Sequence, residues 1–71
     1  MATIKLEELE KVYASTSNVI DKRVETFTER TEQWKDSYKG EHWNLQTESL
    51  KSILNELESV IDAFKDWNEE N

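Results

Sequence analysis

Apolar residues recur along this chain at intervals of three and four, which is the spacing of one face of an α-helix. The first half carries Leu9, Tyr13, Thr16, Ile20, Val24, Phe27, Thr31, Trp34 and Tyr38. The second half carries Trp43, Gln46, Leu50, Ile53, Leu57, Val60, Phe64 and Trp67, a series that Leu54 and Ile61 widen. No stretch alternates as a strand would. The pattern predicts an all-α chain with one long helix in each half.

Gly40 is the only glycine, and the chain contains no proline. Because glycine adopts left-handed backbone angles without a Cβ clash, we expect the chain to reverse there. The prediction is a single domain over residues 1–71, with a helix over 4–38 that Thr3 caps, a turn over 39–41 and a helix over 42–68. Trp34, Tyr38 and Trp43 lie around Gly40 and are expected to cover the closed end of this antiparallel hairpin.

Residues 14–18, Ala-Ser-Thr-Ser-Asn, are the weakest part of the first predicted helix. Serine, threonine and asparagine compete with the backbone for hydrogen bonds, and Asn18 resembles an N-cap. A three-helix chain with a break at this point is therefore an alternative. We favour one continuous helix, because the apolar series keeps nearly the same phase across the segment.

The chain has 71 residues and no cysteine. A two-helix hairpin of this length buries too little apolar surface to be stable alone, and a disulfide cannot add to its stability. We therefore expect it to pair with itself or with a related hairpin, as a homodimer or heterodimer, in a four-helix bundle. The expected interface residues are Leu9, Tyr13, Ile20, Val24, Phe27, Leu50, Ile53, Leu57, Val60, Phe64 and Trp67.

The formal net charge is −7, and from Glu41 onward eight acidic residues accompany only Lys51 and Lys65. Such a surface repels phosphate, so direct nucleic-acid binding is not expected. No apolar run is long enough to span a bilayer, and the first residues lack the pattern of a cleavable signal peptide. Membrane insertion is not expected, and the compartment stays open between the cytoplasm and export without a cleaved signal.

Catalytic chemistry has little basis in this sequence. His42 is the only histidine, and no glycine-rich phosphate loop or reactive cysteine is present. A metal site needs three or four converging ligands, and a histidine pair at helical spacing is absent. We expect no catalytic residue, no metal, no cofactor and no enzymatic activity.

The tripeptide Tyr38-Lys39-Gly40, between a long first helix and an amphipathic second one, resembles the aromatic-x-Gly turn of the Trp-x-Gly family, with tyrosine in place of tryptophan. These are small helical hairpins exported by type VII secretion systems of Gram-positive bacteria and mycobacteria. The opening Met-Ala-Thr-Ile-Lys-Leu-Glu-Glu-Leu is similar to the start of streptococcal members. The resemblance implies a non-catalytic dimer of hairpins that serves as a secretion substrate, partner or chaperone.

Two other functions are compatible with the sequence. An acidic inhibitor would occupy a nucleic-acid-binding groove on a basic protein, with Glu56, Asp62, Asp66 and Glu70 imitating phosphates. The other is a plain structural coiled coil. One form of it is a single unbroken helix through Gly40, since a single glycine costs a helix only about 1 kcal/mol.

Overall fold

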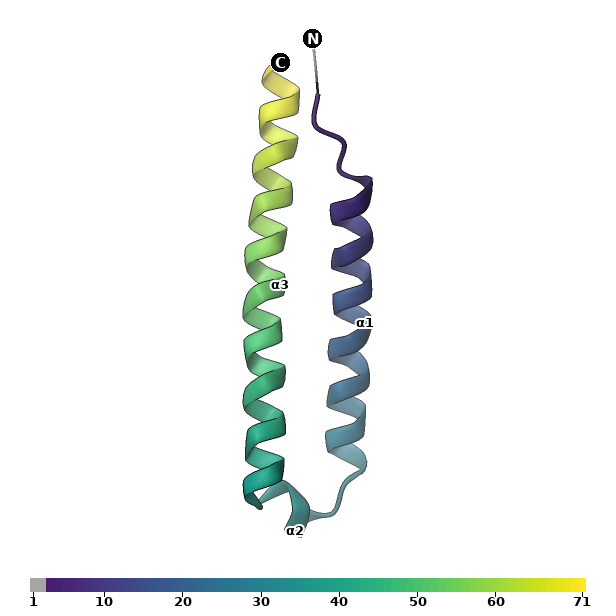
Figure 1. Cartoon of the computed structure of the whole chain (residues 1–71), viewed down its shortest axis with the longest axis vertical. Coiled ribbons are helices and arrows are strands. Elements are labelled where there is room, and N and C mark those ends of the chain that lie inside the picture. Colours follow the sequence, from purple (N-terminus) through teal and green to yellow (C-terminus); the bar gives the residue numbers. More distant parts are fainter. Residues whose placement is uncertain (1–2) are drawn as a thin grey trace.

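The computed structural model describes residues 3–71, and the elements in that range are three helices and no strand. Helix α1 comprises Glu7–Glu29, the short α2 comprises Glu32–Lys35, and α3 comprises Tyr38–Glu70. In Figure 1, α1 and α3 lie side by side and run in opposite directions, with α2 at the end where they join. The described part measures 57 × 15 × 11 Å. The prediction of an all-α chain is confirmed.

None of the described helices is both long enough and apolar enough to cross a membrane.

The start of α1 differs from the prediction. Thr3 does not cap a helix beginning at residue 4; α1 begins at Glu7, and no side chain at the Leu6 position caps it. The backbone of Ile4 instead bonds to the far end of α3. Its N–H donates to Asn68 Oδ1 at 2.9 Å, and Asn68 Nδ2 donates to the Ile4 carbonyl at 2.9 Å. Because both polar groups of Ile4 are satisfied in this way, the segment before Glu7 has no need of helical hydrogen bonds.

Residues 14–18 lie inside α1, which is continuous from Glu7 to Glu29. The three-helix alternative with a break at Asn18 is therefore wrong. Thr16 and Ser17 are half-buried, whereas Ser15 and Asn18 are exposed. Small polar side chains are tolerated here because neighbouring turns of α1 carry the apolar residues that pack against α3.

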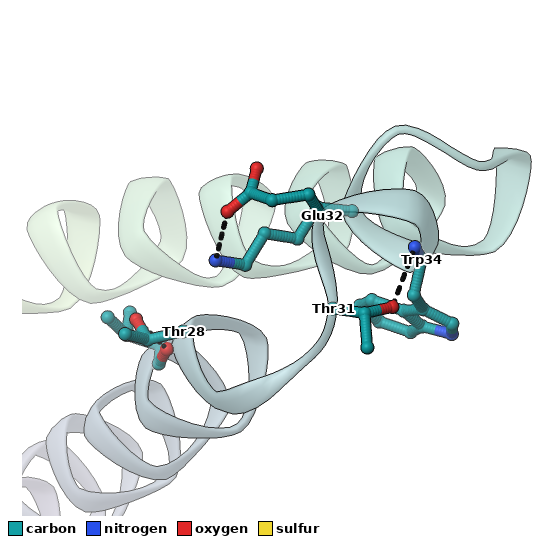
Figure 2. A network of polar contacts seen from close by, with 6 residues as sticks. Thr28, Thr31, Glu32 and Trp34 are labelled. Carbon is teal, nitrogen blue, oxygen red and sulfur yellow. Dashed lines mark hydrogen bonds and ion pairs between the residues drawn. The ribbon is translucent and has the colours of Figure 1, made fainter.

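The connection between the long helices lies earlier than predicted. The chain leaves the helix at Arg30 and again between α2 and α3, so a helix over 4–38 with a turn over 39–41 is wrong, and so is one unbroken helix. Two N-caps explain the breaks. Thr31 Oγ1 accepts from the N–H of Trp34 at 3.2 Å, as Figure 2 shows. Ser37 Oγ accepts from the N–H of Gly40 at 3.3 Å.

Gly40 lies in the first turn of α3, and no described residue has a positive φ angle. The glycine is needed for a close approach of backbones rather than for a reversal. A Cβ at this position would lie 2.6 Å from the carbonyl oxygen and 2.8 Å from the Cα of Lys35, and would also meet the carbonyl oxygen of Trp34. The backbone of α2 therefore packs directly on α3 where Gly40 has no side chain.

One line of contacts joins α1 and α3. On α3 it includes Trp43, Thr47, Leu50, Leu54, Leu57, Ile61, Phe64 and Asn68, at alternating steps of four and three residues. On α1 it includes Leu9, Tyr13, Ile20 and Phe27. We call these residues the seam. Ile20 and Ile61, at 8% and 6% exposure, are the only buried apolar side chains in the described range. The core of a single chain is therefore thin.

Replacing Gly40 with alanine separates two explanations of this glycine. If its only effect were on helix propensity, alanine would stabilise the protein by about 1 kcal/mol. Because the new Cβ would collide with the α2 backbone, we expect destabilisation by about 1 to 3 kcal/mol instead. Urea unfolding followed by circular dichroism measures the difference.

The control for helix propensity is Ser52→Ala, at an exposed position inside α3. It should be neutral or slightly stabilising. A Gly40→Ala protein as stable as Ser52→Ala would show that α2 does not pack closely on α3.

Candidate interaction surface

Four exposed apolar residues each precede a seam residue by one position. They are Val12 before Tyr13, Val19 before Ile20, Ile53 before Leu54 and Val60 before Ile61, with exposures of 53%, 44%, 56% and 45%. One residue corresponds to a rotation of about 100° around a helix, so these side chains point sideways from the seam. Because α1 and α3 run in opposite directions, a residue one position before the seam points to the same side of the pair on both helices. The four residues therefore share one face of the α1–α3 pair.

The spacing along each helix keeps these residues on one side. Val12 and Val19 are seven residues apart on α1, and so are Ile53 and Val60 on α3. Seven residues correspond to about two helical turns. Two exposed apolar residues from each helix therefore lie along this side.

The row extends to the end where the termini lie. Ile4 and Trp67 are 42% and 45% exposed, and they line an apolar groove of about 340 Å³ together with Val60, Ala63 and Phe64. We call Ile4, Val12, Val19, Ile53, Val60 and Trp67 the apolar face. Its residues come from both helices and from the segment before α1.

The opposite side of the pair is charged. Glu10, Glu58 and Asp62 each follow a seam residue by one position, so they point away from the apolar face. Together with Tyr13, Ile61 and Lys65 they line a hollow of about 250 Å³. The two sides of one thin molecule therefore differ. One carries the apolar face, with Glu8 and Glu56 beside it at the positions before Leu9 and Leu57, and the other is mainly acidic.

A polar cluster holds α1 and α3 together near the turn. The Arg23 guanidinium lies 3.9 Å from the ring centre of Trp43 and donates to Thr47 Oγ1 at 3.0 Å, to Gln46 Oε1 at 3.3 Å and to the Trp43 carbonyl at 3.2 Å. Trp43 Nε1 donates in return to the Arg23 carbonyl at 3.1 Å. Thr47 is only 3% exposed. We call this set the Arg23 clamp. Since each bond joins a fixed pair of positions, the clamp opposes sliding of one helix along the other.

The aromatic cluster at the turn differs in membership from the prediction. Trp34 lies edge to face with Trp43, at 6.2 Å between ring centroids, and with Phe27 at 6.0 Å. Tyr38 was expected in this cluster but is 82% exposed and stacks on the exposed His42. It points outward because it begins α3 on the side away from the seam. Within residues 3–71, no group of three or more histidine, cysteine or acidic side chains is arranged to hold a metal ion.

The predicted interface residues fall into two sets. The first lies in the seam within one chain and is at least half-buried: Leu9, Tyr13, Ile20, Phe27, Leu50, Leu57 and Phe64. The second is exposed: Ile53, Val60 and Trp67 on the apolar face, and Val24 outside it at 43% exposure. The sequence reading treated both sets as one stripe. It also missed Ile4, Val12, Val19, Arg23, Thr47 and Asn68.

The chain matches no protein-family model, no curated protein and no solved structure in the three comparisons made. Its surface is therefore interpreted from its own geometry.

The Arg23 clamp is tested by Arg23→Lys, which keeps the charge but removes the planar group that serves three acceptors. We expect a loss of about 1 to 2 kcal/mol in the free energy of unfolding, because the interactions are charge-assisted and partly buried. Urea denaturation measures it. Arg30→Lys is the matched control, since Arg30 is exposed and lies 4.9 Å from the ring centre of Trp34. Equal, small effects of the two substitutions would show that the clamp contributes nothing specific.

Proposed function

We propose that this chain is a non-catalytic interaction protein whose apolar face takes up a second helical pair, giving a four-helix bundle. The observation that carries the proposal is the grouping of six exposed apolar residues on one side of the α1–α3 pair, opposite an acidic side. Exposed apolar residues scattered singly need no explanation, whereas a contiguous patch marks an interaction site.

The thin core supports this proposal. Only two apolar side chains are buried among residues 3–71, although the chain carries many more at helical spacing. A domain of this size gains little stability from one seam, and neither a disulfide nor a described metal cluster adds to it. Covering the apolar face would supply the missing burial, at about 25 cal/mol for each Å² of apolar surface removed from water.

A helical partner fits this face better than an extended peptide. The residues of the face recur at seven-residue intervals on both helices, Val12 with Val19 and Ile53 with Val60 and Trp67. This is the spacing at which facing helices interdigitate. In this proposal the antiparallel hairpin is the subunit, and its partner is itself or a related hairpin.

The place of such a bundle in a cell is proposed from the resemblance to the Trp-x-Gly family. As a relative of the Trp-x-Gly proteins, the chain would be a type VII secretion substrate, a partner of one or a chaperone for one. Tyr38-Lys39-Gly40 begins α3 and does not form the turn, so the support comes from the helical layout rather than from this tripeptide.

An acidic inhibitor is the second candidate, and the charged side of the molecule favours it. Asp62, Asp66 and Glu70 follow one another at four-residue intervals on α3, and all three are exposed. Binding through these carboxylates would weaken steeply with added salt, whereas binding through the apolar face would change little. Titration of a captured partner at two salt concentrations therefore separates the two functions.

The apolar face is tested by Val60→Asp. Val60 is 45% exposed in the single chain, so a charge there leaves the seam intact but places an unpaired carboxylate in the proposed interface. We expect the associated state to be lost while the far-ultraviolet circular dichroism of the chain stays helical. Sedimentation velocity measures the association.

Asn55→Asp is the matched control, because it adds the same charge on the opposite side of α3 and should leave association unchanged. Leu57→Asp is less informative, since Leu57 lies in the seam and its loss would unfold the pair as well. Equal behaviour of Val60→Asp and Asn55→Asp would contradict the proposed interface.

A further inference from the structure

We propose that the helix which packs on the apolar face carries a lysine or arginine within its own apolar stripe, and that this cation pairs with Glu56. The inference rests on the proposed function and names the chemistry of the partner at one position. Glu56 is exposed, and it lies beside the apolar face.

Glu56 is surrounded by apolar residues of α3. It precedes a seam residue, Leu57, by one position, and the same offset places Ile53 and Val60 on the apolar face. It follows Ile53 by three residues and precedes Val60 by four, so the three side chains are neighbours on the helix surface. Ile53 and Val60 are 56% and 45% exposed. A partner that covers both of them therefore covers part of Glu56 as well.

No cation in the described range neutralises this carboxylate. Among residues 3–71, Glu8 on the same side pairs with Lys11 at 3.6 Å, whereas Glu56 forms no ion pair. The positions three and four residues away from Glu56 on α3 hold only serine, isoleucine and valine. In the single chain Glu56 is exposed, so water solvates it. A partner without a cation would remove this water and leave the carboxylate unpaired, which is costly.

The surroundings of Glu56 fit a long cationic side chain. Lysine and arginine have apolar stems that pack on apolar surface while the charged end reaches a polar group. A stem from the facing helix would lie against Ile53 and Val60, and its charged end would reach the Glu56 carboxylate. One such ion pair within an apolar interface also selects the partner and the register in which it binds.

The charge of the whole chain favours the same kind of partner. The net charge is −7. On α3, the positions directly before seam residues hold no lysine or arginine, and Glu56 is the only acidic residue among them. An electrostatic field of this sign attracts a cationic helix and repels an acidic one.

Two synthetic peptides serve as probes of this pairing. Each is an amphipathic helix about four heptads long with leucine along its apolar stripe. They differ only at one central position of that stripe, which is lysine in one peptide and glutamate in the other. We expect the unmodified chain to bind the lysine peptide at least about tenfold more tightly, because the glutamate would meet Glu56. Fluorescence anisotropy, with each labelled peptide kept below the concentration at which it self-associates, measures both affinities.

Glu56→Lys should reverse this preference, so that the glutamate peptide binds more tightly. Glu58→Lys is the matched control, because it makes the same change of charge at an exposed position on the other side of Leu57. It should keep the preference for the lysine peptide. Val60→Asp should weaken the binding of both peptides, which shows that they lie on the apolar face.

The outcomes separate this proposal from the proposed function. Equal effects of Glu56→Lys and Glu58→Lys, with binding still weakened by Val60→Asp, would overturn the pairing with Glu56 and leave the proposed function standing. Peptide binding that Val60→Asp does not weaken would lie elsewhere on the chain and overturn both. If neither peptide binds, the pairing falls, and sedimentation of the chain itself still decides the proposed function. A dimer of the unmodified chain that Glu56→Gln strengthens would mean that a second copy covers this position without a cation, which overturns the pairing alone.

Discussion

Two helices placed side by side can cover only one side of each other, and most of this structure follows from that limit. The seam takes one row of residues from each helix. Ile20 and Ile61 are the only buried apolar side chains in the described range. A second apolar row on each helix, rotated by about a quarter turn, stays in contact with water. A single chain therefore leaves this second row uncovered.

Polar contacts fix the register of α1 and α3, and so fix how the second apolar rows of the two helices lie relative to each other. The Arg23 clamp acts near the turn, and the paired hydrogen bonds between Asn68 and Ile4 act at the other end. A shift of one helix by a single turn would break both. Because α1 and α3 both contribute to the apolar face, the clamp that stabilises one chain also shapes the surface offered to another. Gly40 contributes by letting α2 approach α3 closely and close the pair.

The sequence predicted the helical class and the continuity of α1 because those depend on periodicity, which is a local property. The predicted turn was in the wrong place. Gly40 was expected to adopt a left-handed backbone conformation, whereas it allows the backbone of α2 to pack closely on α3. The capping side chains Thr31 and Ser37 were the overlooked signal. The sequence could not show that Leu54 and Ile61 lie in the seam while Ile53 and Val60 next to them are exposed. Which of two neighbouring residues faces inward depends on how the partner helix packs. The contacts of Arg23 and Asn68 could not be predicted, since their hydrogen-bond partners lie far away in sequence.

The central claim is that the apolar face is covered by a partner in solution, and small-angle X-ray scattering over a concentration series tests it most directly. One chain has a mass of 8.4 kDa and a longest dimension of 57 Å. A bundle of two copies side by side predicts a scattering mass of about twice that value with almost no increase in length. A mass of a single chain that persists to millimolar concentration, with the helices fully formed, would contradict the pairing of this chain with itself.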